Sequence, residues 1–157
     1  MLFLLRQVPL AEYQIRPATA RDAPAIRSLI HDVQINPTGL SWRHFLVAVT
    51  VKGELLGCGQ VKTHSDGSRE LASIAVQEKA RKQGIASSII RTLLAQEQAR
   101  PLYLICRSRL ESFYNKFGFH AILLDDMPPY FKRIYRLVGM FRSNSPHEDR
   151  LMVMRLE

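Results

Sequence analysis

The chain has 157 residues, the length of one domain with room for a sizeable core. Hydrophobic residues make up 46% and charged residues 23%, an ordinary globular composition that excludes disordered, collagen-like and low-complexity chains. The formal net charge of +8 points to a polyanionic partner: nucleic acid, an acidic membrane face or a phosphate-bearing cofactor. Charge alone does not choose among these three.

The two cysteines, Cys58 and Cys106, lie in apolar runs and form no CxxC pair. No group of Cys and His has metal-ligand spacing, so we expect no metal site. We expect two buried free thiols in a reducing compartment rather than a disulfide. The apolar run of residues 1–5 ends at Arg6 and is far shorter than the roughly 20 residues that span a bilayer. We expect this run to pack on the rest of the domain. We also expect a soluble, cytoplasmic protein with no membrane partner.

The first half of the chain predicts a strand, a helix and three further strands. Residues 13–17 are strand-like, and the capping-box pattern Thr19 to Asp22 opens a helix that we expect over 20–33. Apolar runs follow at 45–51, 55–61 and 70–76, joined by turns that contain glycine. Such a series is typical of an antiparallel meander.

After residue 84 the apolar period becomes helical. It predicts an amphipathic helix over 84–98 and a short buried strand over 102–106, and a second capping box opens a helix over 108–116. The last strands are expected at 120–124 and 151–156, with a basic amphipathic helix over 129–141 between them. This order predicts an α/β (α+β) domain with a mixed sheet.

The turn between the strand over 70–76 and the helix over 84–98 has the features of an anion site. The first turn of a helix carries unpaired N–H groups and the positive end of its dipole. Gly84 lets a phosphate approach the backbone, and Arg81 and Lys82 add positive charge. The pattern is neither a P-loop nor a Rossmann turn. The simpler alternative is a basic loop with a glycine at a helix start.

Two motifs resemble those of a known family. Residues 70–76 followed by Arg-Lys-Gln-Gly-Ile-Ala (81–86) resemble the acetyl-CoA motif Arg/Gln-x-x-Gly-x-Gly/Ala of the GNAT superfamily of N-acetyltransferases. Residues 113–119, Phe-Tyr-Asn-Lys-Phe-Gly-Phe, resemble its second motif, and residues 15–18 are similar to its usual start. The resemblance covers about residues 15–119 and implies a GNAT-like single domain whose helices flank a mostly antiparallel sheet.

The resemblance implies acetyl-CoA as the acetyl donor. The backbone of one strand would pair with its pantetheine arm, and the amides of the following turn would hold its pyrophosphate. The implied strand residues are Ile74, Ala75 and Val76, and the implied turn residues are Arg81, Lys82, Gln83, Gly84, Ile85, Ala86 and Ser87. The chain departs from the family at Glu78, where many members have proline, and at Arg107, where many have asparagine. Arg107 would instead meet the cofactor or an acidic substrate.

Acetyl transfer to an amine needs a base and benefits from an acid. An alkylamine with a pKa near 10.4 is almost wholly protonated at neutral pH, and the departing thiolate gains from a proton donor. Glu70 is the candidate base, because many family members have a glutamate there, and in a regular strand it shares a face with Ala72, Ile74 and Val76. The alternative for Glu70 is a solvated charge at a strand end.

Tyr114 is the candidate acid, and its alternative is a tyrosine that packs a helix on the sheet. Asp125 and Asp126 are weaker rivals to Glu70 as the base. No role is assigned to the lone histidines, which more often serve the structure; these are His31, His44, His64 and His120.

These features predict an acetyl-CoA-dependent N-acetyltransferase that moves an acetyl group to a primary amine by direct transfer. A CoA-binding sensor with little turnover would share the same motifs. A basic nucleic-acid-binding module is the weaker alternative, because no nucleic-acid motif appears. The segment 125–146 reads as an insert that lines the acceptor site, and its alternatives are a helix that covers the sheet or one that joins a homodimer.

Overall fold

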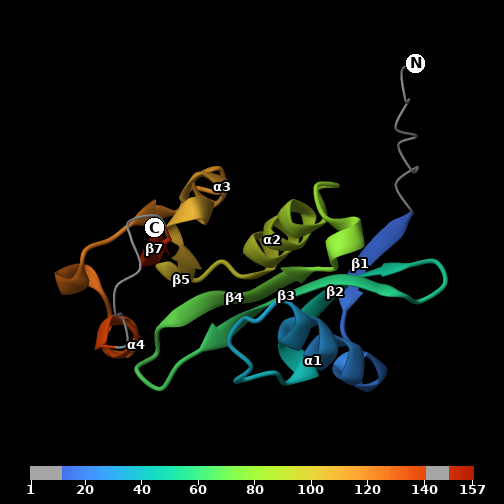
Figure 1. Cartoon of the computed structure of the whole chain (residues 1–157), viewed down its shortest axis with the longest axis horizontal. Helices are drawn as coiled ribbons and strands as arrows, with labels where there is room; N and C mark the ends of the chain where they lie inside the picture. Colours follow the sequence, from blue (N-terminus) through green and yellow to red (C-terminus); the bar gives the residue numbers. More distant parts are fainter. Residues whose placement is uncertain (1–11, 141–148) are drawn as a thin grey trace, which may run out of the picture. The chain divides into compact units, whose positions relative to one another are not determined.

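The computed structural model describes residues 12–140 and 149–157, where the chain forms seven strands and four α-helices (Figure 1). The strands are β1 (Tyr13–Pro17), β2 (Phe45–Thr50), β3 (Leu55–Thr63), β4 (Arg69–Val76), β5 (Leu102–Arg107), β6 (His120–Ala121) and β7 (Leu151–Leu156). The helices are α1 (Ala23–Asp32), α2 (Ile85–Gln96), α3 (Glu111–Asn115) and α4 (Pro129–Met140). The apolar run 1–5 and the expected helix end at residue 141 lie outside the described residues.

All seven described strands belong to one mixed sheet with the order β1-β2-β3-β4-β5-β7-β6. β1 pairs antiparallel with β2, β5 and β6 each pair antiparallel with β7, and β4 pairs parallel with β5. The expected mixed α/β sheet flanked by helices, in a single domain, is confirmed. The three strands of the predicted meander are neighbours in the sheet.

The chain groups into two compact units, and β3, β4 and α2 each contribute residues to both. The first unit takes in the residues up to Gly59 together with Ser73–Ile90. The second takes in Gln60–Ala72 and the residues from Arg91 onward. Each unit is described below by itself.

In the first unit, α1 begins directly after Asp22, whose carboxylate accepts hydrogen bonds from the preceding turn. Asp22 Oδ2 accepts hydrogen bonds from the Thr19 backbone N–H at 2.7 Å and from Thr19 Oγ1 at 3.1 Å. Arg16 on β1 donates to both carboxylate oxygens of Asp22, at 2.7 and 3.1 Å. The helix then buries Ile26 and Ile30 completely in a core shared with β2 and β3. The predicted capping box therefore fixes the start of the helical segment.

A close backbone contact fixes α2 against β3 in the first unit. A Cβ atom on Gly57 would lie 3.0 Å from the Ala75 carbonyl oxygen, 3.2 Å from Ile85 Cγ2 and 3.3 Å from Ile89 Cδ1. A larger residue at Gly57 would push the helix off the sheet. Ile89 and the neighbouring Ile90 are fully buried, in agreement with the predicted apolar face of α2.

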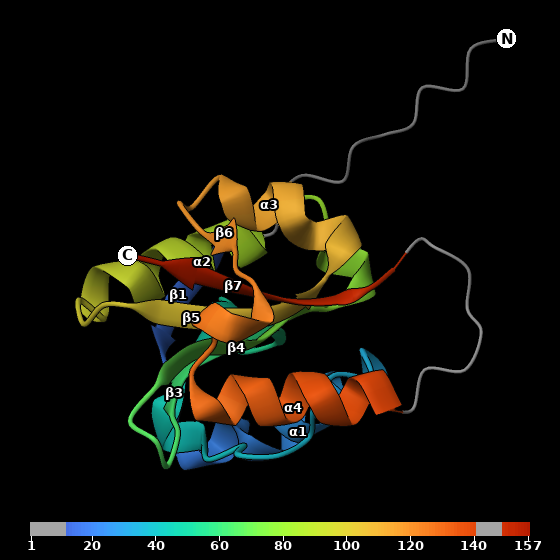
Figure 2. The same ribbon diagram turned by 90° about the vertical axis from the view of Figure 1, so that its left-hand side faces the viewer.

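In the second unit, α3 and α4 lie on opposite sides of β5 and β7 (Figure 2). β5 and β7 pair along their whole length, from Leu102 with Leu156 to Arg107 with Leu151. Because side chains alternate along a strand, this pairing separates two sets of side chains. One set packs with Met127 and with Phe131 of α4, and it comprises Tyr103, Ile105 and Val153.

The last part of the sheet is shorter than the sequence predicts. A strand was expected over 120–124, but β6 ends at Ala121. The Ile122 N–H still bonds to the Val153 carbonyl oxygen, and residues Leu124–Asp126 then form a 3-10 turn. The Asp126 and Met127 N–H groups bond back to the Leu123 and Leu124 carbonyl oxygens within this turn. The apolar pattern therefore continues past Ala121, although the strand ends there and the backbone turns.

Within residues 12–140 and 149–157, no helix has both the length and the apolar composition needed to cross a bilayer.

Candidate active site

The predicted phosphate turn connects β4 to α2 in the first unit. After Val76, residues Glu78–Ala80 form a 3-10 turn, and α2 begins at Ile85. Lys82 and Gly84 both have left-handed backbone conformations, with φ of 61° and 78°. Backbone N–H groups that converge around left-handed residues form a concave anion site, here directly at a helix N-terminus. The left-handed residues at this helix start are compatible with the expected phosphate site.

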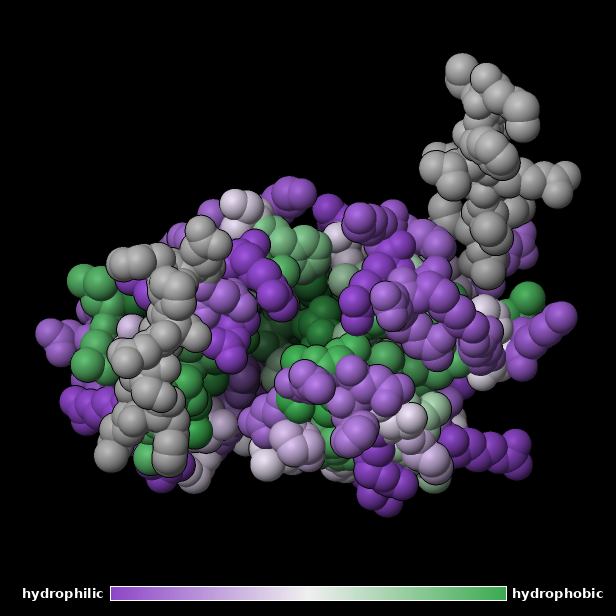
Figure 3. Space-filling model, viewed as in Figure 1, coloured by the Kyte–Doolittle hydropathy of each residue, from purple (hydrophilic) through white to green (hydrophobic). Residues whose placement is uncertain are grey.

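The surroundings of this turn also favour an anion. Arg81, Lys82 and Gly84 are exposed, and a Cβ atom built on Gly84 would have no heavy atom within 4 Å. Figure 3 shows hydrophilic side chains gathered over the turn between β4 and α2. Lys79 forms an ion pair with Glu54, so part of the charge near the turn is neutralised within the protein. Arg81 and Lys82 remain the charges closest in sequence to the open glycine.

The predicted cofactor residues divide into those with exposed and those with buried side chains. Ala75 and Ile85 are 4% and 1% exposed, so only their backbone atoms are available to a ligand. Ile74, Val76, Gln83, Ala86 and Ser87 are partly exposed. This division agrees with a site in which backbone amides, rather than side chains, make most contacts.

A cavity of about 800 Å³ opens beside the turn within the first unit. Gln77, Glu78, Lys79 and Arg81 line one side of it. Its other side comes from α1 and the residue after it, through Ala25, Ser28, Leu29, Asp32 and Val33. The contribution of α1 had no sequence signal, because it depends on how the helix packs beside the turn.

Glu70 is a buried carboxyl group in the second unit. It is 8% exposed, lies at the start of β4 and pairs in register with Tyr103 of β5. The alternative of a solvated charge at a strand end is therefore wrong. Burial raises the pKa of Glu70, whereas the hydrogen bond from His64 and the positive charge of Lys62 act to lower it.

His64 is the hydrogen-bond partner of Glu70, with Nε2 2.6 Å from Glu70 Oε2. Tyr130 of α4 stacks on the His64 ring at a centroid distance of 3.5 Å. The sequence offered no visible partner for His64, and the structure supplies one. A signal was present in the hairpin that the turn at 65–68 closes, because residues 62, 64 and 70 then fall on one face. The bond from the His64 N–H to the Ser68 carbonyl oxygen, at 2.8 Å, closes this hairpin.

β4 is not regular along its length. Ser73 has a φ of 58°, outside the range of an extended strand. The expectation that Glu70 shares a face with Ile74 and Val76 assumed a regular strand, and this assumption does not hold at Ser73.

Tyr114 of α3 is a buried tyrosine in the second unit. It is 9% exposed and makes edge contacts with the rings of Phe113 and Phe119. Burial raises its pKa, and the nearby Cys106 raises it further, so the hydroxyl group stays protonated at neutral pH. The position is compatible with a proton donor, and it also packs α3.

The structure places Glu70 and Tyr114 at different faces of β5. Glu70 is opposite Tyr103, whose side chain packs on α4, whereas Tyr114 neighbours Cys106. Tyr103 and Cys106 are three residues apart, about 10 Å along the strand, and so point to opposite faces. The two side chains therefore lie on different faces of the sheet at β5.

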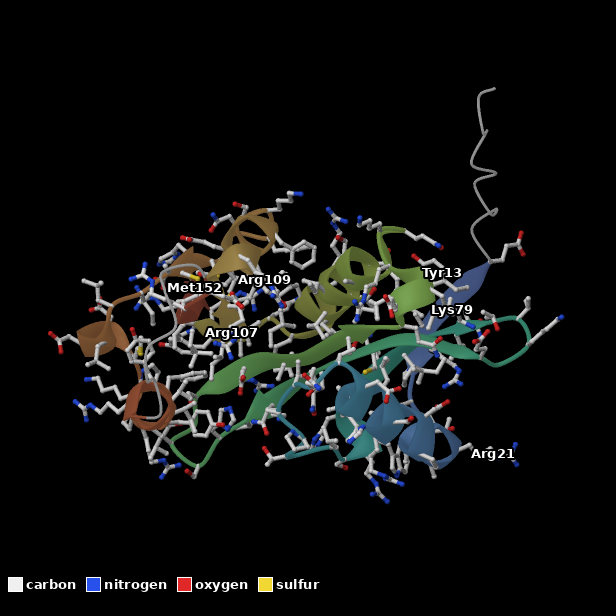
Figure 4. All side chains as sticks on the ribbon, viewed as in Figure 1. Tyr13, Arg21, Lys79, Arg107, Arg109 and Met152 are labelled. Carbon is white, nitrogen blue, oxygen red and sulfur yellow. The ribbon has the colours of Figure 1, made fainter. Side chains whose placement is uncertain are left out.

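Arg107 and Arg109 occur at the end of β5 and in the turn after it (Figure 4). Arg107 Nη1 donates to the Asp149 carbonyl oxygen at 3.3 Å, and Arg109 forms an ion pair with the Asp149 carboxylate at 3.4 Å. Both side chains are exposed. Arg107 thus ties the start of the β7 segment to the end of β5. Asp125 and Asp126, the weaker rivals to Glu70, are exposed in the 3-10 turn after β6.

Known proteins share this fold. N-acetylglutamate synthase from Neisseria gonorrhoeae, complexed with coenzyme A and N-acetyl-glutamate, aligns with a TM-score of 0.72 and 21% identity over 94% of this chain and 36% of that chain. Rv2747 from Mycobacterium tuberculosis, in complex with CoA and NLQ, aligns with a TM-score of 0.66 and 20% identity over 91% and 98% of the two chains. Ard1 from Thermoplasma volcanium has a TM-score of 0.63 and 18% identity, over 91% and 95%.

The chain spans about a third of the two N-acetylglutamate synthase structures, 36% and 34% of their lengths. At these identities the structural likeness establishes the fold and nothing finer. No curated protein matches the sequence significantly. The family assignment rests on the sequence itself: residues 41–121 match the model of the acetyltransferase (GNAT) domain, and they include β4, the phosphate turn and α3. More than half of the chain lies within that match, and the protein belongs to the GNAT family of acetyltransferases.

Proposed function

We propose that this protein is an N-acetyltransferase that moves the acetyl group of acetyl-CoA to a primary amine by direct transfer. The observation that carries the proposal is the buried Glu70 carboxyl group at the start of β4. A carboxyl group with a raised pKa is a base suited to work near neutral pH. It lies on the strand that runs into the phosphate turn.

The turn after β4 fits the phosphates of the donor. Gly84 leaves open space where any other residue would place a Cβ atom, and Arg81 and Lys82 are exposed beside it. The amides of residues 81–87 would hold the pyrophosphate, and the backbone of Ile74, Ala75 and Val76 would bind the pantetheine arm. Acetyl-CoA supplies the acetyl group as a thioester. The coenzyme A complexes of two structural neighbours support this assignment.

Glu70 and Tyr114 divide the proton transfers between them. Glu70 accepts a proton from the ammonium group of the acceptor, which leaves the nitrogen lone pair available for attack. Tyr114 keeps its proton at neutral pH and donates it to the departing sulfur. Their positions at different faces of β5 agree with an acceptor and a leaving group that occupy opposite sides of the reacting carbon.

The cysteines favour direct transfer over a route through an acetylated enzyme. Burial raises the pKa of Cys58 to about 12 and that of Cys106 to about 11. Thiolate is the nucleophilic form of cysteine, and both thiols are almost wholly protonated at neutral pH. Neither residue is therefore suited to carry the acetyl group.

The first turn of α4 would line the acceptor side of the site. Tyr130 stacks on His64, which in turn bonds Glu70, so this turn borders the base. The segment 125–146 thus serves in part as a wall for the amine, and its residues 141–146 lie outside the described residues. Arg133, 5.9 Å from the centre of the Tyr130 ring, adds positive charge at that border.

The proposal is tested by coenzyme A release from acetyl-CoA in the presence of a panel of amines. The panel includes glutamate, because one structural neighbour holds N-acetyl-glutamate, together with a simple alkylamine, a peptide α-amine and a peptide lysine. We expect at least one amine to be acetylated, with the product confirmed by mass spectrometry. Tight binding of acetyl-CoA without transfer to any amine class would instead identify a CoA-binding sensor.

A further inference from the structure

The pairing of Glu70 with His64 constrains which oxygen of the carboxylate can react. His64 Nε2 lies 2.6 Å from Glu70 Oε2, and both side chains are 11% exposed. An ionised carboxylate only accepts hydrogen bonds, so His64 donates through the Nε2–H when Glu70 is charged. A short bond of this kind between buried groups holds the carboxylate in one orientation.

The His64 ring is itself held by the start of α4. Tyr130 lies parallel to it, with a centroid distance of 3.5 Å and an interplanar angle of 12°. Phe131 meets it edge-on at 5.7 Å and 89°. The backbone N–H of Tyr130 donates to Asp66 Oδ2 at 2.9 Å, which ties the first turn of α4 to the hairpin that carries His64. These contacts hold the plane of the imidazole against the first turn of α4.

The charged and titratable groups around Glu70 come from three elements. Lys62 on β3 and His64 after it favour the ionised carboxylate, and burial opposes it. Tyr130 on α4 has a raised pKa, from its burial and from the charges of Glu70 and Asp66, against the effect of Arg133. Tyr103 on β5 is the register partner of Glu70. Of these groups, His64 is the one with a hydrogen bond to the Glu70 carboxylate in the described structure.

We propose that His64 is a positioning residue for Glu70: its Nε2–H holds Oε2 and directs Oε1 to the acceptor amine. This inference rests on the proposed function of Glu70 as the base. In the step that follows, one N–H bond of the ammonium group breaks and one O–H bond forms at Oε1. His64 keeps its proton throughout, the carboxylate becomes neutral, and the amine is released for attack. Tyr130 and Asp66 act one step further out, by holding the imidazole.

The test compares two substitutions at His64. His64→Gln places an amide N–H near the position of Nε2 and retains the donor, whereas His64→Leu removes it. The first readout is the titration of the Glu70 carboxyl carbon by NMR, assigned by the loss of its signal in Glu70→Gln. We expect the midpoint to rise by about one pH unit or more in His64→Leu, since a lost donor disfavours the charged form. His64→Gln is expected to titrate close to wild type.

The second readout is turnover with the best amine. We expect kcat of His64→Leu to fall about tenfold or more, with an unchanged KM for acetyl-CoA and an acid limb of the pH–rate profile displaced to higher pH. His64→Gln is expected to recover most of kcat. His31→Gln is the matched control, because that imidazole is 91% exposed on α1. Tyr130→Leu keeps His64 and removes the ring that stacks on it. It should therefore raise the Glu70 midpoint, but less than His64→Leu does. This variant replaces His64→Leu in the test if His64→Leu does not fold.

The outcomes separate this inference from the proposed function. A Glu70 midpoint that is the same in His64→Leu and in wild type overturns the positioning role, even if Glu70 proves to be the base. Wild-type turnover in Glu70→Gln overturns the proposed base, whatever the midpoint in His64→Leu. A raised midpoint with a kcat that Gln restores and Leu does not supports the inference.

Discussion

The hydroxyl group of Tyr114 is enclosed, and its removal leaves the ring contacts in place. We expect Tyr114→Phe to keep the fold and the affinity for acetyl-CoA, because the contacts with Phe113 and Phe119 involve the ring alone. Turnover should fall by about 10²–10⁴, the scale of a lost general acid. The loss should appear in kcat rather than in either KM, since charge develops on sulfur only in the transition state.

Steady-state kinetics with two thioesters check this role. A donor with a more acidic leaving thiol needs less help, so the defect of Tyr114→Phe should shrink with it. Phe113→Leu is the comparison for packing, because it removes an aromatic contact and leaves the hydroxyl group. Wild-type kcat in Tyr114→Phe would mean that Tyr114 only packs α3 and that water protonates the sulfur.

Asp22 holds the start of the helical segment in the first unit. The bond from Arg16 is the largest effect that lowers the pKa of Asp22, and the two bonds from Thr19 lower it further. A carboxyl group with a lowered pKa stabilises the fold above its ordinary pKa of 3.8 and loses that effect as the pH falls through its folded value. We expect Asp22→Ala to lower the free energy of unfolding by about 2 kcal/mol at neutral pH.

Urea unfolding at several pH values measures this effect. The difference between wild type and Asp22→Ala should be constant above pH 5 and shrink at pH values below about 3.8. Asp32→Ala is the control, because its carboxylate is 70% exposed at the end of α1 and should change stability little. A difference between wild type and Asp22→Ala that persists at low pH would show that the loss is not due to the charged bond with Arg16.

Glu70 and Tyr114 could be singled out from the sequence because each stands in a motif with fixed spacing, and their roles stay predictions. The structure adds what surrounds them. The stacking of Tyr130 on His64 could not be found, since this contact joins residues 66 positions apart, whereas the hairpin register did offer a signal for His64 beside Glu70. The left-handed backbone at Ser73 could not be predicted either, because a serine within an apolar run does not indicate an irregular strand.

At the scale of elements, the turn before α2 offers a test of the cofactor site. We expect Gly84→Glu to abolish acetyl-CoA binding, because the new carboxylate occupies the open space beside Arg81 and Lys82 and repels phosphate. The fold should survive, since a Cβ atom at this position meets no heavy atom within 4 Å and the residue is exposed. The cost of a left-handed φ in a non-glycine residue is about 1–2 kcal/mol. Calorimetric titration measures the affinity.

Gly53→Glu is the matched control for this substitution. Gly53 also has a positive φ, 83°, and open space around its Cβ position, but it lies in the turn between β2 and β3. The Gly53→Glu variant should lose a similar amount of stability and keep its affinity for acetyl-CoA. Wild-type affinity in a folded Gly84→Glu variant would place the phosphates elsewhere.

The helices and strands were predictable where their apolar period was long, as in α1, α2 and the three meander strands. The wrong prediction concerns a short element. The strand expected over 120–124 became the two residues of β6 and a turn, because one buried face and a following turn can produce the same apolar run. The pairing of β5 with β7, which places α3 and α4 on opposite faces, depends on tertiary contacts that no local pattern contains.

At the scale of the whole molecule, the net charge of +8 is spread over several surfaces. Arg81 and Lys82 belong to the phosphate turn, whereas Lys132, Arg133 and Arg136 border a cavity of about 350 Å³ along α4. This distribution is consistent with a local phosphate site and does not need a nucleic-acid partner. Salt-dependent binding of DNA or RNA would restore that alternative.

The central claim is that Glu70 takes a proton from the acceptor amine, and the pH–rate profile of Glu70→Gln tests it most directly. Wild-type kcat/KM should fall at low pH as Glu70 becomes protonated, at a pH above the usual range for a glutamate because burial raises its pKa. Glu70→Gln keeps the size of the side chain and removes its basicity. Its turnover near neutral pH should be about 10²–10⁴ lower and should recover as the pH approaches the pKa of the amine. A Glu70→Gln profile with the same height and shape as the wild-type profile would contradict the account.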